Sequence, residues 1–176
     1  MKKVLLGVGS NIEPRRNISS GIRALGRIFG ELACSSVYQC QAVGFAGPDF
    51  HNLVVLVYTD KSIVEICSGI RDIEVSHGRT SFSKKLSSRL LDIDILTVDD
   101  IVGERDGVRL PRPGFLEQPY VLGPLAELVP KARHPQIGKT YEVLWQMLSA
   151  ERGFLFHDNQ MGPLLRLPTI AEPELL

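Results

Sequence analysis

Two aspartates, Asp92 and Asp94, interrupt an apolar run in the middle of the chain. If this run is a strand, its side chains alternate between two faces, so Leu91, Ile93 and Ile95 share one face and both carboxylates share the other. Carboxylates spaced in this way can bind one Mg²⁺, or two ions about 3.5–4 Å apart, as in enzymes that transfer phosphate groups. The alternative is a strand with one solvent-exposed face, on which aspartates need no function.

Basic residues lie directly upstream of the two aspartates. Arg89 precedes Asp92 by three residues, and Lys84 and Lys85 come shortly before it. A guanidinium can bind two phosphate oxygens at once, whereas an ammonium acts as a point charge. The sequence therefore predicts an anion site beside the metal site, although a lysine pair is more often a solvated surface feature.

The composition is that of one domain of ordinary size. The chain has 176 residues, of which 44% are hydrophobic, which is enough to bury one core. Twenty basic and twenty acidic residues cancel, so the chain as a whole has no electrostatic attraction for nucleic acid or for an anionic membrane. We expect a single domain over residues 1–159 and a loosely attached C-terminal tail over residues 160–176.

The three cysteines, Cys34, Cys40 and Cys67, are an odd number without close pairing. This pattern argues against a disulfide framework and against a zinc site. The basic start is followed by an apolar run that is too short for a signal peptide, and no stretch approaches the roughly 18 apolar residues of a membrane helix. These features predict a cytoplasmic protein that binds small molecules and needs no membrane, nucleic acid or obligatory protein partner.

The hydrophobic pattern predicts alternating strands and helices. In chain order we expect a strand over 4–8, a helix from Pro14 to Gly30, strands over 32–38 and 52–58, a helix from a cap at Asp60 to Gly78, and the aspartate strand. This β-α-β-β-α-β order indicates an α+β fold with a ferredoxin-like βαββαβ core, in which helices cover an antiparallel sheet in two or three layers.

Helices and irregular segments are expected to extend this core. A loop over 40–49 is long enough to carry function, and the segment over 79–88 lacks an apolar period and is predicted to be mobile. Asp99 and Asp100 are predicted to turn a hairpin into Ile101 and Val102. Later come an irregular segment over 109–119, helices over 121–128 and 141–149, and an extended piece over 153–157.

Six further short motifs occur in a fixed order around the aspartate strand. They are Gly9-Ser10-Asn11, Val43-Gly44, Phe50-His51-Asn52, the segment Glu74 to Arg79, Pro111, and the segment Tyr120 to Leu125. Together with the Arg-x-x-Asp-x-Asp element of residues 89–94, they resemble the 6-hydroxymethyl-7,8-dihydropterin pyrophosphokinase family of the folate pathway. The resemblance covers roughly residues 4–150, and the ordered set is far more specific than any one motif.

The resemblance implies that the terminal two phosphates of ATP are transferred to the pterin hydroxymethyl group, with release of AMP. In that family two strand aspartates hold two Mg²⁺ ions, a role that would fall to Asp92 and Asp94. Arg79 and Arg89 would join them as catalytic residues, with Arg89 as the phosphate clamp. Glu74, Arg79 and Arg89 match family positions near the nucleotide or its phosphates.

The resemblance also implies a pterin pocket. Phe50 and Tyr120 stand where the family places two aromatic rings around the pterin. Asn52 matches the asparagine that reads the pterin edge, because an amide offers both donors and acceptors. Backbone groups near Val43 would complete the contacts to that edge.

The nucleotide half departs from the family pattern. Ser81 and Gln118 stand where arginines are usual, Leu86 where a tryptophan is usual, and Arg112 at the start of a usual His-Tyr pair. Lys84, Lys85 and Arg112 could supply charge to the nucleotide from another angle, or they could be solvated surface cations. We expect weaker ATP binding than is typical of the family.

Two other functions are compatible with parts of the pattern. A divergent pterin-binding protein with impaired or lost ATP chemistry would explain the missing cations, but it would have little use for a pair of metal-binding aspartates. An RNA-binding module is a weaker rival, because no clear aromatic and basic strand is present and the net charge is zero.

Overall fold

The computed structural model describes residues 1–79 and 87–152 and the backbone of residues 163–165. The first part of the chain forms β1 (Lys2–Ser10), α1 (Pro14–Phe29), β2 (Leu32–Cys34), β3 (Val37–Cys40), β4 (Phe50–Thr59), α2 (Ile63–Ser76) and β5 (Asp92–Val98). This confirms the predicted β-α-β-β-α-β order, with the predicted strand over 32–38 divided into β2 and β3. Beyond it lie β6 (Gly103–Arg105), β7 (Val108–Leu110), a 3-10 helix η1 (Phe115–Glu117), α3 (Pro119–Leu128), α4 (Tyr141–Arg152) and β8 (Pro163–Leu165).

The central sheet has the strand order β5-β1-β4-β3-β8, and β2 pairs with β4 beside β3. Every pairing in it is antiparallel. An order in which the first strand lies between the last strand and the third strand of a βαββαβ unit is the ferredoxin-like arrangement. The predicted fold class is therefore confirmed.

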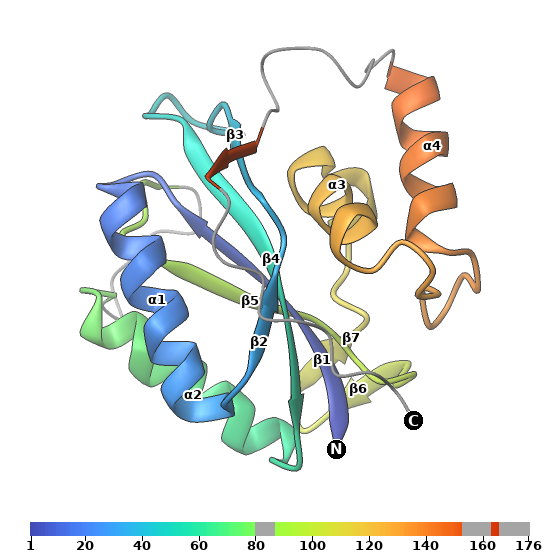
Figure 1. The fold of residues 1–176 in the computed structure, drawn as a ribbon, viewed down its shortest axis with the longest axis horizontal. Coiled ribbons are helices and arrows are strands. Elements are labelled where there is room, and N and C mark those ends of the chain that lie inside the picture. The colour runs from blue at the N-terminus through green and yellow to red at the C-terminus, as the bar shows by residue number, and fades with distance from the viewer. Residues whose placement is uncertain (80–86, 153–162, 166–176) are drawn as a thin grey trace.

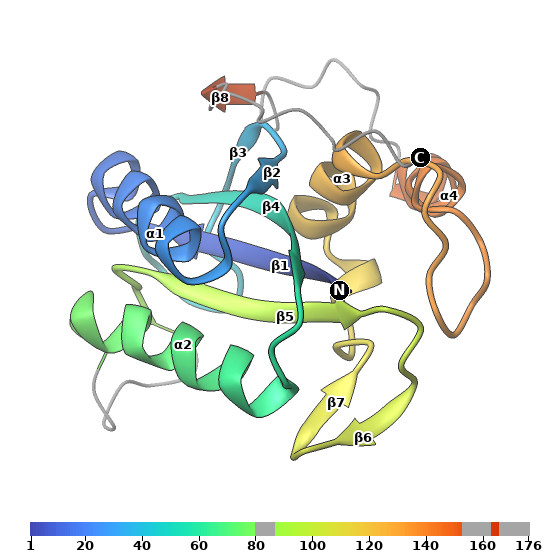
Figure 2. The same cartoon turned by 60° about the horizontal axis from the view of Figure 1, so that its bottom comes forward.

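Helices cover both faces of the sheet, which gives three layers (Figures 1 and 2). Alternate residues of β1 face opposite sides: Val4 and Leu6 belong to the core beneath α1 and α2, whereas Leu5 belongs to the core beneath α3 and α4. A strand buried on both faces needs apolar residues at every position, because each face contacts a helix layer. The continuous apolar start of the chain is thus explained by the third layer.

A bulge in β5 separates its two ends. Leu5 of β1 is opposite Thr97, but Leu6 is opposite Ile95, so Leu96 is an extra residue in β5. Before the bulge, Ile93 and Ile95 pack into the core beneath α1 and α2. Because side chains alternate along a strand, Asp92 and Asp94 face the α3 side of the sheet, as the sequence pattern predicts.

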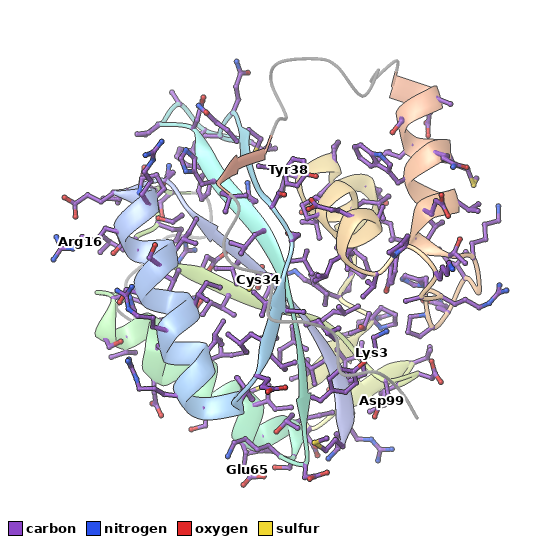
Figure 3. All side chains as sticks on the ribbon, in the orientation of Figure 1. Lys3, Arg16, Cys34, Tyr38, Glu65 and Asp99 are labelled. Atoms are coloured by element: carbon purple, nitrogen blue, oxygen red, sulfur yellow. The ribbon has the colours of Figure 1, made fainter. Side chains whose placement is uncertain are left out.

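α3 is anchored to the edge of the sheet by one carboxylate. Glu127 accepts hydrogen bonds from the backbone N–H of Ser36 (3.0 Å) and its hydroxyl (2.7 Å) with one oxygen. The other oxygen accepts from the Tyr38 hydroxyl at 2.6 Å, and Figure 3 shows Tyr38 beside α3. These bonds lie where the edge strand breaks between β2 and β3, and they fix the helix that carries Tyr120.

Two local predictions are wrong. The cap of α2 is Ser62, not Asp60: Ser62 Oγ accepts from the Glu65 N–H, and the Glu65 carboxylate accepts from the Ser62 N–H at 2.7 Å. This Ser-x-x-Glu capping box satisfies two N–H groups at once, whereas the carboxylate of Asp60 pairs with the N-terminal amine. Glu65 lies on the outer surface of α2 in Figure 3.

The second wrong prediction concerns the hairpin after β5. The chain does turn at Asp99 and Asp100, where the Ile101 N–H donates to the Val98 carbonyl oxygen at 3.1 Å, but Ile101 and Val102 form no strand. The side chain of Asp99 accepts a hydrogen bond from the Lys3 N–H at 2.7 Å, and the two residues are neighbours in Figure 3. The hairpin forms between β6 and β7 instead. Its turn is Asp106-Gly107, with φ of 53° and 77°, and this dipeptide suits a two-residue turn with positive φ.

The remaining predictions have mixed outcomes. The helix predicted over 121–128 begins at Pro119, which places Tyr120 in its first turn, and the one predicted over 141–149 reaches Arg152. Within the predicted tail, β8 pairs with β3. The extended piece predicted over 153–157 and most of the loop predicted over 79–88 lie outside the described residues. No helix in the described part of the chain has the length and apolar character to cross a membrane.

Candidate active site

A cavity of about 240 Å³ opens on the α3 side of the sheet. The ends of β1, β4 and β5 form its base, and the loop after β3, the start of α3 and the segment after β7 form its walls. Its lining includes Gly7, Gly9, Cys40, Gln41, Val43, Phe45, Phe50, Asn52, Ser87, Arg89, Asp92, Asp94, Leu96, Arg112, Phe115, Gln118 and Tyr120. One cavity thus brings together residues from six separate segments of the chain.

Two glycines of β1 form part of the floor. Gly7 is opposite Asp94, and Gly9 lies between Asp92 and Asn52 in the sheet. A Cβ atom at Gly9 would lie 2.8 Å from Asn52 Oδ1, which is closer than van der Waals contact. The strand predicted over 4–8 extends to Ser10, so Gly9 is a strand residue. Gly7 and Gly9 are two residues apart, so they share one face of the strand and leave it without side chains. This spacing is the sequence signal for the open floor of the cavity.

One end of the cavity is aromatic and uncharged. It contains Phe50 and Asn52 from β4 and Tyr120 from α3, with Val43 on the neighbouring loop. Phe45 from the same loop meets Phe50 edge-on, with ring centroids 6.3 Å apart. The structure thus brings the four residues predicted for the pterin pocket into the lining of one cavity, and burial raises the pKa of Tyr120.

Cys40 is a residue at this end that the sequence reasoning missed. The amide nitrogen of Asn52 donates a hydrogen bond to Cys40 Sγ at 3.1 Å, and Asn52 is only 9% exposed. Burial raises the pKa of the Cys40 thiol to about 11, so the sulfur stays protonated near neutral pH. The register of β3 with β4 places Cys40 beside the motif of Phe50 and Asn52, and only this long-range pairing could have revealed it.

The other end of the cavity is charged. Arg112 Nη1 lies 2.6 Å from Asp94 Oδ1, and Arg79 Nη1 lies 3.2 Å from Asp92 Oδ1. The pKa of Asp94 is raised to about 6, first by burial and then by the negative charge of Asp92, while the charge of Arg112 opposes the shift. The two carboxylates therefore repel each other in a partly dry environment.

Glu74 supports this end from behind the sheet. Its carboxylate is buried, forms an ion pair with Arg79, and accepts a hydrogen bond from the Ile93 N–H at 2.9 Å. Burial raises the pKa of Glu74, and the Ile93 N–H and the Arg79 charge oppose that shift. Because Ile93 lies between the two aspartates, Glu74 fixes the backbone that carries them.

The residues predicted for the nucleotide fall into three groups. Arg89 and Arg112 line the cavity. Glu74 and Arg79 are absent from its lining among the described residues, although Arg79 reaches Asp92. Lys84 and Lys85 lie outside the described residues. Gln118, one of the departures from the family pattern, also lines the cavity.

The charged end has the chemistry to hold Mg²⁺. Asp92 and Asp94 offer carboxylate oxygens on one face, which are ligands that this ion prefers. A cation between them would relieve their mutual repulsion, which adds to the effect of burial in raising the pKa of Asp94. The described part of the chain contains no group of three or more acidic, histidine or cysteine side chains placed to hold a metal ion. Waters and substrate phosphates would therefore complete the coordination, as is usual for Mg²⁺.

Comparisons with known proteins give one consistent family. The family model of 7,8-dihydro-6-hydroxymethylpterin-pyrophosphokinase matches residues 5–130. A 2-amino-4-hydroxy-6-hydroxymethyldihydropteridine pyrophosphokinase from Synechocystis is 34% identical over 97% of this chain and 86% of its own length. One of the same name from Aquifex aeolicus is 32% identical over 77% of this chain and 85% of its own length.

The solved structures with a similar fold are more distant in sequence. The wild-type HPPK-DHPS of Plasmodium falciparum with SDX-DHP has a TM-score of 0.68 at 13% identity, and it covers 91% of this chain. A triple mutant of the same protein has a TM-score of 0.71 at 12% identity. This chain spans 46% of each of those longer chains, and at this identity the likeness establishes the fold alone.

Proposed function

Because this chain belongs to the 7,8-dihydro-6-hydroxymethylpterin-pyrophosphokinase family, we propose that it transfers the pyrophosphoryl group of ATP to the hydroxymethyl group of 6-hydroxymethyl-7,8-dihydropterin in folate biosynthesis. The observation that carries this proposal is the joining of two chemically different ends in one cavity. Aromatic and amide side chains suited to a flat heterocycle lie beside two carboxylates and two arginines suited to a metal triphosphate.

The pterin occupies the uncharged end in this proposal. The rings of Phe50 and Tyr120 contact its faces, which buries apolar surface on both sides of the heterocycle. Asn52 hydrogen bonds to its edge, and the Cys40 thiol restrains the amide from one side. Tyr120 keeps its proton near neutral pH because its pKa is raised, so this end adds no negative charge that would repel the triphosphate.

The triphosphate occupies the charged end. Asp92 and Asp94 would hold Mg²⁺, which when bound neutralises phosphate charge and orients the triphosphate for in-line transfer. Arg89 binds phosphate oxygens through its guanidinium fork, and Arg112 exchanges its pairing with Asp94 for the phosphates. Requirement for Mg²⁺, and for two ions rather than one, is part of this proposal.

The transfer itself needs positioning and no covalent intermediate on the chain. The oxygen of the pterin hydroxymethyl group forms a bond to the β-phosphorus, and the bond from that phosphorus to the oxygen bridging to the α-phosphorus breaks. The hydroxyl proton leaves to solvent, and AMP departs with the bridging oxygen. Fixed aromatic walls at one end and fixed charges at the other supply the alignment that this displacement requires.

The alternative of a pterin-binding protein without ATP chemistry rests on the neutral Gln118 in the cavity wall, where the family usually has an arginine. Identification of the product distinguishes the two functions. The protein is incubated with ATP, Mg²⁺ and 6-hydroxymethyl-7,8-dihydropterin, and the pterin is analysed by mass spectrometry. We expect the pterin diphosphate together with AMP, and we expect neither from Asp94→Asn. Saturable pterin binding with no product from the wild type would favour the binding protein.

A further inference from the structure

Asn11 lies at a junction of three segments that the reaction described above does not use. It follows β1 in the turn that leads to α1, and it is only 4% exposed. Its amide nitrogen donates hydrogen bonds to the Pro48 carbonyl oxygen at 3.1 Å and to Ser88 Oγ at 3.2 Å. Its amide oxygen accepts from the Arg89 N–H at 2.7 Å. One side chain thus joins residue 48 to residues 88 and 89.

The backbone of the same turn binds Arg89 as well. The N–H groups of Asn11 and Ile12 donate to the Arg89 carbonyl oxygen, at 3.1 and 3.2 Å. Both backbone polar groups of Arg89 are therefore bonded to this turn. Arg89 lines the cavity, so the turn after β1 fixes the backbone position from which the Arg89 side chain extends.

The two segments that Asn11 joins serve opposite ends of the cavity. Pro48 ends the loop that carries Val43 and Phe45 and leads into Phe50, at the aromatic end. Ser88 and Arg89 lead into Asp92 at the charged end. Only an amide of this length provides two N–H donors and an acceptor together. An aspartate would keep the acceptor but lose both donors.

We propose that Asn11 is a positioning residue that holds the pterin end and the phosphate end of the cavity in register. This inference rests on the proposed function. Transfer requires the pterin hydroxyl and the β-phosphorus to approach within about 3–3.5 Å, and a displacement of about 1 Å can reduce the rate about 10²-fold. Each ligand alone contacts mainly one end, so loss of register affects kcat more than the affinity for either ligand.

The test compares Asn11→Asp with Asn17→Asp. Asn17 is also buried, lies in the first turn of α1, and donates through its amide to the Ile12 carbonyl oxygen at 2.6 Å, but it has no side-chain bond to residues 48, 88 or 89 among the described contacts. The measurements are kcat, the Tm, and the Kd of pterin and of a non-hydrolysable ATP analogue with Mg²⁺. Each Kd is measured with and without the other ligand.

We expect Asn11→Asp to lower kcat about 10²-fold while each single-ligand Kd changes less than about threefold, and to reduce the influence of one ligand on the Kd of the other. Asn17→Asp should keep near wild-type kcat. Ser88→Ala, at an exposed position, removes one of the three bonds with little risk to folding and should lower kcat by a smaller factor.

Two results would overturn the role of Asn11. One is that each ligand changes the Kd of the other by the same factor in Asn11→Asp as in the wild type, a comparison that requires no turnover. The other is an equal loss of kcat in Asn11→Asp and Asn17→Asp at matched Tm. If Asn11→Asp does not fold, an unchanged Ser88→Ala overturns it. Absence of product from the wild type overturns the proposed function separately.

Discussion

The two ends of the cavity differ in how their side chains are held before any ligand binds. At the aromatic end, Asn52 is oriented by Cys40, and Phe50 packs against Phe45. At the charged end, the carboxylates of Asp92 and Asp94 are already paired with arginines. The aromatic end can receive a neutral ring without breaking an ion pair, whereas the charged end must exchange protein partners for metal and phosphate. The side chains proposed to bind the pterin and those proposed to bind metal and phosphate are thus held in place by different contacts.

The largest effect is expected from removing a carboxylate at the charged end. Asp92→Ala or Asp94→Ala should reduce the rate of AMP formation by roughly 10³-fold or more, because a missing ligand leaves the metal and the triphosphate without a fixed position. The Kd of pterin should change only a few-fold, because the aromatic end is untouched. Steady-state kinetics and fluorescence titration of pterin measure the two quantities. Unchanged turnover would refute the assignment of both aspartates.

The next effect is expected at the floor of the aromatic end. Gly9→Ala would place a methyl group 2.8 Å from Asn52 Oδ1, so Asn52 must rotate away from its place at the cavity. We expect the Kd of pterin to rise about 10-fold to 100-fold, since a hydrogen-bonding amide is displaced. The Kd of an ATP analogue should stay near its wild-type value.

Gly7→Ala is the matched control for this variant. Its methyl group would meet Leu96 Cδ2 at 3.4 Å, a flexible side-chain end, in the same strand and on the same face. Pterin binding should change little in this variant. Equal losses of pterin affinity in both variants would mean that any side chain added to this face of β1 disturbs the cavity, and that the contact with Asn52 is not the cause.

A smaller effect is expected from Arg112, which the structure places against Asp94. Arg112→Ala should raise the KM for ATP about 10-fold, because a charge-assisted contact to a phosphate is lost, and it should leave the Kd of pterin unchanged. Arg109→Ala removes an exposed cation of β7 and should change neither. If both variants behave alike, Arg112 acts only as a surface charge.

The smallest effect concerns the reactivity of Cys40. Because burial raises the pKa of its thiol to about 11, iodoacetamide should modify it slowly at neutral pH. While the pH is below that pKa, the rate should rise about tenfold for each unit by which the pH increases, since only the thiolate reacts. Bound pterin should protect Cys40 but not Cys67 of α2, as peptide mass spectrometry would measure. Rapid modification at neutral pH, or modification that pterin leaves unchanged, would contradict the position of Cys40.

The sequence predicted those features that depend on short periods. Alternation with a period of two placed Asp92 and Asp94 opposite Ile93 and Ile95, and the order of strands and helices predicted the ferredoxin-like sheet. It could not predict the bulge at Leu96, because a bulge depends on pairing with β1. It also misplaced the cap of α2, where the Ser62 and Glu65 pair satisfies more backbone groups than Asp60 could.

The site was predictable only where a motif is contiguous. Phe50 and Asn52 belong to one strand, and Tyr120 was matched through its own motif. Cys40 reaches the cavity because of the register between β3 and β4, and Asn11 reaches Pro48 and Arg89 across long sequence separations. Contacts of this kind are determined by the packed fold, and no local pattern in the sequence carries them.

Pterin-dependent release of AMP is the most direct test of the account. The rate of AMP formation is measured with ATP and Mg²⁺ alone, then with 6-hydroxymethyl-7,8-dihydropterin added, for the wild type and for Asp92→Ala. We predict AMP formation by the wild type that requires the pterin and that is lost in the variant. Pterin that binds at saturating concentration without stimulating AMP formation would contradict the claim that one cavity joins the two substrates for transfer.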